Sequence, residues 1–91
     1  MAYKIQPVET VEIELHKIMK RDKALYMQIL KKIAKIAEEP HGSGKWMRDT
    51  YAGVKEVHLL HGRFVLMFKI DDERKVVSIV NIEHHPKSHG Y

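Results

Sequence analysis

Residues 54–70 read VKEVHLLHGRFVLMFKI, and this stretch decides the fold. Its first seven residues alternate in part between apolar and polar side chains, which predicts a strand with one buried face. The dipeptide His61-Gly62 predicts a hairpin turn. Residues 63–70 are apolar on both faces at their centre, which is typical of a central strand covered from both sides. A turn this short joins antiparallel neighbours, so the stretch predicts a β-hairpin inside a sheet.

Further strands are predicted on both sides of this hairpin. Residues 76–83 follow the turn DDERK and form the last strand. Residues 3–8 form a short first strand, and Pro7 near its end suits an edge or a terminus. The segment PHGSGKW, residues 40–46, is predicted to be a loop that leads towards the hairpin.

Two helices are predicted between the first strand and this loop. Apolar residues recur at steps of three and four, and the first helix, opening at Glu9-Thr10, is acidic near its start and basic near its end. Asp22 is a good N-cap for the second helix, which ends at Pro40 and Gly42. The break between the two helices is therefore a tight turn.

The order of these elements predicts a two-layer α+β domain, β-α-α-β-β-β, in which a helical hairpin packs on one face of an antiparallel sheet. The 91 residues are expected to form a single domain, residues 1–91, around one core. Phe64 and Phe68 are predicted to lie in that core, and Trp46 is predicted to cover it as a lid. The other face of the sheet stays partly open.

The chain is basic, with 16 Lys and Arg against 12 Asp and Glu. Seven basic residues and one acid lie between Lys17 and Lys35, in a stripe that either attracts polyanions or is a solvated helix face. Cysteine is absent, which excludes disulfides and thiolate sites and fits a reducing compartment. No run approaches the ~20 apolar residues of a membrane span, so a cytoplasmic protein without a membrane partner is expected.

The chain ends in NIEHHPKSHGY, which holds three of its seven histidines. His58, on the strand before the hairpin, is predicted to meet either His84 or His85 across the sheet. The register decides between them, because a slip of one residue exchanges the two faces. Two histidines can move protons near neutral pH and so promote attack of an RNA 2′-hydroxyl on its phosphodiester. The cations that could offset charge on the phosphate are Lys45, Lys55, Arg63 and Lys87.

Other roles for the histidines stay open. Zinc could bind His58, His89 and one of the adjacent pair, but the chain has no cysteine and no H-x-x-x-H spacing on a helix. No metal and no cofactor are therefore expected. A solvated tail without a role is the plain alternative. His41 could face the site, or it could stabilise the carboxyl end of its helix.

Residues 3–91 resemble the RelE/ParE superfamily of bacterial and archaeal type II toxins. The resemblance rests on the element order, on E-E-P after the helix pair, on G-V-K-E-V-H-L leading to G-R-F-V-L-M-F-K-I-D, and on the end E-H-H-P-K-S-H-G-Y. Within the superfamily the chain is most similar to the histidine-bearing, YafQ-like branch. The matching positions are His58, Phe68, His84 or His85, and Tyr91.

The resemblance implies a ribosome-dependent endoribonuclease that cleaves mRNA without a metal and is neutralised by an antitoxin, with which it could form a hetero-oligomer. His85 is expected to be the main acid or base, with His58 as its partner and His84 as the alternative. The expected contacts to phosphate and base are Arg63, Lys87 and Tyr91.

The chain also departs from the patterns of both branches. Val65 stands where the RelE type carries an arginine inside its apolar strand, and Glu56 and His58 stand near the place of its lysine pair. Gly62 and Arg63 stand where the YafQ-like branch carries an acid. A ParE-type inhibitor of DNA gyrase and a non-catalytic binding module that uses the Lys17–Lys35 stripe are therefore alternative functions.

Overall fold

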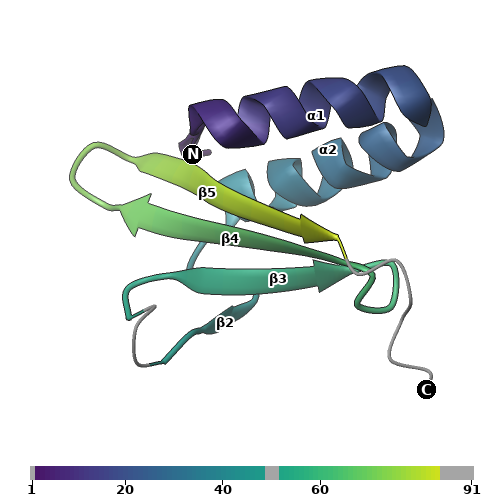
Figure 1. The fold of residues 1–91 in the computed structure, drawn as a ribbon. Helices are drawn as coiled ribbons and strands as arrows, with labels where there is room; N and C mark the ends of the chain where they lie inside the picture. Colours follow the sequence, from purple (N-terminus) through teal and green to yellow (C-terminus); the bar gives the residue numbers. More distant parts are fainter. Residues whose placement is uncertain (1, 49–51, 85–91) are drawn as a thin grey trace.

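The computed structural model describes residues 2–48 and 52–84, which form two layers (Figure 1). The elements in chain order are β1 (Lys4–Pro7), α1 (Glu9–Arg21), α2 (Lys23–Glu38), β2 (Lys45–Trp46), β3 (Lys55–Leu59), β4 (Phe64–Asp71) and β5 (Val76–His84). The helical hairpin covers one face of the sheet, so the predicted α+β architecture is confirmed. Among the described helices, none is long and apolar enough to cross a membrane.

The sheet is mixed, with strand order β1-β5-β4-β3-β2. The expectation of an antiparallel sheet is wrong at one edge, because β1 runs parallel to β5 and pairs Lys4 with Val76. Short turns join only β3, β4 and β5, so they fix no direction for β1, whose partner is the most distant strand in sequence. The predicted loop at residues 40–46 also ends in a strand, since Lys45 pairs with Glu56 in β3.

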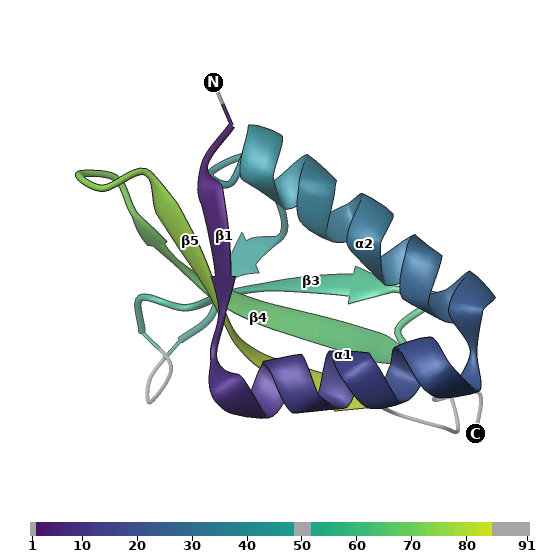
Figure 2. The ribbon, with the colours of Figure 1, turned by 90° about the horizontal axis from the view of Figure 1, so that it is seen from above.

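The helical hairpin follows from local signals. The first turn of α1 carries Glu9 and Glu12 and its last turn carries Lys20 and Arg21, which complements the helix dipole. A single residue, Asp22, separates the two helices, and its side chain accepts a hydrogen bond of 3.1 Å from the backbone N–H of Leu25. The predicted N-cap is therefore confirmed. Seen from above, α1 lies over β5 while α2 lies towards β3 (Figure 2).

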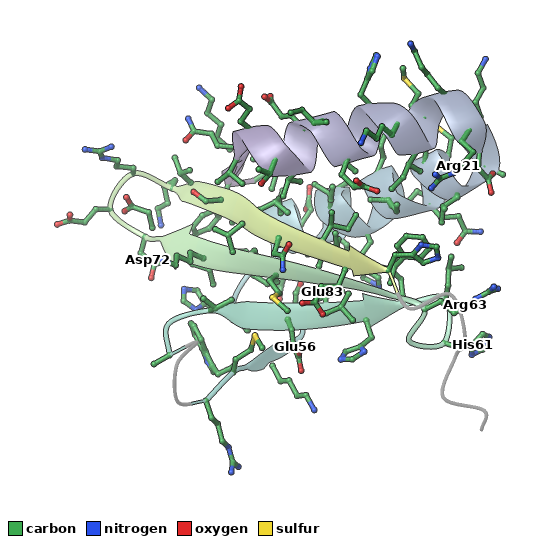
Figure 3. The ribbon with its side chains drawn as sticks, viewed as in Figure 1. Arg21, Glu56, His61, Arg63, Asp72 and Glu83 are labelled. Atoms are coloured by element: carbon green, nitrogen blue, oxygen red, sulfur yellow. The ribbon has the colours of Figure 1, made fainter. Side chains whose placement is uncertain are left out.

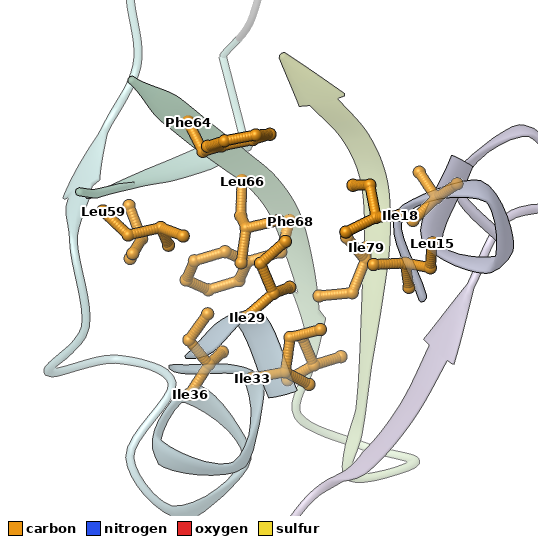
Figure 4. Close-up of a cluster of buried hydrophobic side chains, with 13 residues drawn as sticks. Leu15, Ile18, Ile29, Ile33, Ile36, Leu59, Phe64, Leu66, Phe68 and Ile79 are labelled. Atoms are coloured by element: carbon orange, nitrogen blue, oxygen red, sulfur yellow. The ribbon is translucent and has the colours of Figure 1, made fainter. Parts of the chain in front are cut away.

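The main core lies between the helices and the sheet (Figure 4). Phe64 and Phe68 are both buried in it, as predicted. The other face of β4 is also covered, because Val65 and Met67 pack with Val54 in a second, smaller cluster. The prediction that β4 is a central strand, apolar on both faces, is confirmed.

A β-bulge in β5 changes which of its side chains face the helices. Met67 pairs with Asn81 but Phe68 pairs with Ile79, so Val80 is an extra residue without a partner in β4. Before the bulge, Val77 and Ile79 face the helices. After it, the even-numbered residues do so: Ile82 packs against the main core and His84 stacks on Phe64. The sequence, read as an unbroken alternation along residues 76–83, predicts Asn81 and Glu83 on the face of Val77; the bulge makes that prediction wrong after Val80.

Candidate functional site

His58 lies on the sheet face that points away from the helices, and its pairing register excludes His84 as its partner. Its cross-strand partner is Val65, and Val65 is paired in turn with Glu83. Because paired residues share a face, the row across the sheet is His58, Val65, Glu83. His84 lies on the opposite face against Phe64. Of the two predicted partners of His58 this leaves His85, which lies outside the described residues.

The imidazole of His58 is held beside a carboxylate. Its Nε2 lies 3.5 Å from Oε1 of Glu56, two residues earlier on the same face of β3. The His58 side chain is 51% exposed and that of Glu56 is 19% exposed. Glu56 is thus fixed in the sheet surface while His58 is open to a ligand, and the contact between the two side chains orients the imidazole ring.

His58 also lines a shallow pocket at the edge of β3, here called the edge pocket. It has a volume of about 250 Å³ and is lined by Lys32, Lys35, Gly42, Ser43, Gly44, Val57 and His58. The pocket forms because β2 pairs only with residues 55 and 56, which leaves the rest of this edge of β3 uncovered. Two lysines of α2 thus line the same pocket as His58, at the edge of the sheet.

Sequence reasoning missed Lys32 and Lys35 as site residues and assigned them to a helix stripe. Their spacing of three residues puts them on one face of α2, which was visible in the sequence. The approach of that face to β3 depends on the loop after α2. Gly44 has φ +63°, and a Cβ atom there would lie 2.1 Å from the backbone oxygen of Glu56, so only glycine fits this close passage.

Lys55 is buried, whereas its predicted role in phosphate binding requires an ammonium that faces solvent. It is 2% exposed, and its Nζ donates hydrogen bonds to the backbone oxygens of Pro40 at 3.2 Å and His41 at 2.6 Å. The ring of Trp46 lies over this ammonium, 5.0 Å from it, and is itself 53% exposed, so Trp46 is not a core lid. Burial lowers the pKa of Lys55 from its usual value. Lys55 acts as a clamp that fixes the loop after α2.

Replacing Lys55 with methionine is expected to destabilise the protein by about 1–3 kcal/mol, because the carbonyl groups of Pro40 and His41 then lose the donor that holds the loop. Urea unfolding followed by circular dichroism measures the loss. The exposed Lys31→Met variant on α2 is the control and should match the parent chain. Equal stability of the Lys55 variant and the parent would contradict the clamp.

Arg63 and His84 are brought together, but away from His58. They line a larger pocket of about 590 Å³, here called the end pocket, with Arg21, Asp22, Ala24, Leu25, Gln28, Leu60 and Phe64. Figure 3 shows Arg21 and Arg63 at the same end of the molecule, where the helical hairpin turns. The expectation that Arg63 stands beside His58 is not met by this arrangement.

The remaining predicted contacts divide into two groups. Lys45 is exposed and pairs with Glu56, so it lies on the same face as His58 and stays a candidate for phosphate binding. Lys87, His89 and Tyr91 lie, like His85, outside the described residues. Within residues 2–48 and 52–84, no group of three or more His, Asp or Glu side chains could hold a metal ion.

His41 takes part in a polar cluster at the far end of the sheet. Its Nε2 lies 2.8 Å from Oδ1 of Asp72, to which the hydroxyl of Tyr3 also donates a hydrogen bond of 2.6 Å. His41 therefore fills neither of its predicted roles. The hydrogen bond from Tyr3, followed by that from His41, holds the pKa of Asp72 below its usual value. The hydrogen bond between Tyr3 and Asp72 also raises the pKa of the Tyr3 hydroxyl.

Replacing Asp72 with asparagine is expected to lower stability at neutral pH and to have no effect in strong acid. A carboxyl whose pKa is depressed by folding stabilises the protein above its unfolded pKa, near 3.8. That contribution is lost as the pH falls below 3.8 through the depressed value. Thermal unfolding of both chains at pH 7 and in strong acid measures the difference, and a gap that persists in acid would contradict this account.

The two-layer arrangement of a helical hairpin on a mixed sheet is the fold of RelE-type toxins. It matches RelBE2, described as a toxin–antitoxin complex of Mycobacterium tuberculosis, with a TM-score of 0.79 and 25% identity over 96% of this chain and 95% of that one. It matches the isolated E. coli RelE toxin with a TM-score of 0.79 and 20% identity, over 97% and 89% of the two chains, which shows the fold alone.

The sequence relationship goes further. The chain is 36% identical to the "Putative toxin RelE4" of Methanocaldococcus jannaschii over 83 residues, covering 91% of this chain and 86% of the relative. An uncharacterized protein of Methanosarcina mazei is 32% identical over 77 residues, covering 85% and 87%. No model of a protein family matches the chain. The chain belongs to the RelE family of toxins of toxin–antitoxin systems. Its placement in the YafQ-like branch stays a prediction.

Proposed function

We propose that this chain is a ribosome-dependent endoribonuclease that cleaves mRNA and is neutralised by a cognate antitoxin. Membership of the RelE family supports the class of activity, and its solved relatives include complexes with an antitoxin. The observation that supports a particular site for this activity is the edge pocket. Its lining includes two lysines of α2 and His58, whose half-exposed imidazole lies beside the Glu56 carboxylate.

The edge pocket suits RNA cleavage because it combines a proton acceptor with fixed positive charge. His58 takes the proton of a 2′-hydroxyl, and the resulting oxygen attacks the adjacent phosphorus. The bond from phosphorus to the 5′-oxygen breaks, which leaves a 2′,3′-cyclic phosphate and a 5′-hydroxyl. Lys32 and Lys35 offset the negative charge that builds on the phosphate oxygens. No metal is needed in this scheme.

A second proton-transfer group completes the reaction, and His85 is our candidate for it. It donates a proton to the departing 5′-oxygen, while His58 acts as the base. The register supports His85 over His84, because His84 faces the helices. Lys87 and Tyr91, which follow His85 in the chain, stay candidates for contacts to the phosphate and the base. The Lys17–Lys35 stripe is a basic surface on which an antitoxin segment could fold.

We propose that the chain acts in the cytoplasm, where ribosomes translate mRNA. The activity is therefore tested on translating ribosomes. Purified protein is added to ribosomes that are stalled on a defined mRNA, and primer extension maps the 5′ ends of the fragments. We expect cleavage in the presence of ribosomes and much less on free mRNA. Growth arrest of cells without any mRNA cleavage, with DNA gyrase inhibited instead, would overturn the proposal in favour of a ParE-type activity.

Removing the two lysines of the edge pocket is expected to weaken cleavage and its dependence on salt. The double variant Lys32→Gln, Lys35→Gln should cleave about tenfold less at 0.15 M salt, since each phosphate contact releases counterions. It should also lose less activity than the parent chain when salt is raised. Lys23→Gln with Lys31→Gln removes the same charge from exposed positions of α2 outside the pocket lining and is the control. An equal loss in the control would show that net charge alone is responsible.

A further inference from the structure

The end pocket is not used by the proposed reaction, and its chemistry is unexplained. It lies on the helix side of the sheet, where the turn between α1 and α2 meets the β3–β4 hairpin and the end of β5. His58 lies on the other side. With about 590 Å³ it falls in the range of ~300–1,000 Å³ that is usual for sites that hold small molecules.

Its charge favours an anion. Arg21, at the end of α1, and Arg63, in the β3–β4 hairpin, both line the pocket. Within the part of the chain that the structure describes, neither guanidinium lies within salt-bridge distance of a carboxylate; the recorded salt bridges lie elsewhere, among them His41 with Asp72. The one acid of the lining, Asp22, uses its carboxylate to cap α2. Two guanidinium groups are thus available for a phosphate, which they bind in a planar, bidentate way.

Its aromatic component favours a flat ring. The rings of Phe64 and His84 are stacked almost parallel, with centroids 4.3 Å apart and planes at 4°. Phe64 is buried beneath, while His84 is exposed and lines the pocket. The stack therefore ends at the pocket in an imidazole whose orientation is fixed by the phenyl ring below it. Bases stack on such platforms without regard to sequence.

We propose that the end pocket binds one nucleotide of single-stranded RNA, with its phosphate on Arg21 and Arg63 and its base stacked on His84. A phosphate alone would bind the guanidinium groups and make no contact with the stacked rings of Phe64 and His84. The combination of two arginines with an aromatic platform in one pocket is what a nucleotide requires. Because His58 is on the opposite face of the sheet, this nucleotide is not the one that is cleaved; it lies elsewhere on the bound strand.

The experiment is a titration of the full chain in the His58→Ala form, followed by NMR. This variant lacks the proposed base, so it tests the end pocket independently of the proposed ribonuclease activity. The probes are adenosine 5′-monophosphate, inorganic phosphate and adenosine. We expect the monophosphate to shift the resonances of Arg21, Arg63 and His84 and to bind more tightly than phosphate or adenosine. No shift at these residues would overturn the proposal.

Variants separate the two parts of the site. Arg21→Gln and Arg63→Gln, each made singly, should weaken binding of the monophosphate several-fold, whereas Arg74→Gln, an equal charge change at the other end of β5, should leave that binding unchanged. His84→Ala should weaken binding of the monophosphate several-fold and leave binding of inorganic phosphate unchanged. An equal loss with Arg74→Gln would mean that binding is non-specific attraction. An unchanged affinity with His84→Ala would overturn the stacking of the base.

Discussion

Replacing His58 with alanine is expected to reduce ribosome-dependent mRNA cleavage by about 10²–10⁴-fold, the usual contribution of a general base. The fold should be unaffected, because this side chain is half-exposed and packs in neither apolar cluster. Single-turnover cleavage of an mRNA on stalled ribosomes measures the rate, and circular dichroism checks the fold. His16→Ala, on the exposed side of α1, removes another imidazole and serves as the control.

A cleavage rate within threefold of the parent would exclude His58 as the base. The same comparison separates the two terminal histidines. His85→Ala should be as harmful as the change at His58, while His84→Ala should keep the chemical step and weaken RNA binding instead. A larger loss of the single-turnover rate at His84 than at His85 would show that the reaction takes place on the helix side of the sheet.

Replacing Phe68 with alanine is expected to lower the free energy of unfolding by about 3–5 kcal/mol, which is a large part of the stability of a chain of this size. Phe68 is 0% exposed, on β4 beside the bulge, and its ring fills the space between sheet and helices (Figure 4). Its removal leaves a cavity that rigid neighbours on three elements cannot close. Urea unfolding at constant pH measures the loss.

Phe68→Leu is the matched control, since it keeps most of the buried volume and should cost about 1–1.5 kcal/mol. A loss below about 1 kcal/mol for the alanine variant would mean that the helices move inwards to fill the gap. In that case α2 would move on the sheet more easily than the burial of its apolar side chains suggests.

The sequence predicted the elements well because each has a local signal. The cap at Asp22, the steps of three and four in the helices and the turn before Arg63 act over a few residues. The direction of β1 has no such signal. It is decided by contact with β5, some seventy residues later, where the two strands meet as parallel neighbours. Pairings of this range are not visible in a periodic pattern.

The candidate site was predicted in part for the same reason. His58 was found because it is a histidine on a strand whose partial alternation already puts it opposite to the apolar Val57 and Leu59. Lys55 was misassigned because a lysine at the start of a strand normally points to solvent, whereas here the carbonyl groups of a loop fold around it. Lys32 and Lys35 were missed because only the folded chain brings α2 to the edge of β3.

The bulge at Val80 affects how this protein should be compared with its relatives. A relative without the extra residue would present the side chains before and after that point in unbroken alternation. In an alignment without a gap at the bulge, one column would then hold residues from opposite faces. Two chains could then carry a histidine at the same aligned position and use it for different tasks. Catalytic roles should therefore be transferred between members of this family by strand pairing rather than by residue type.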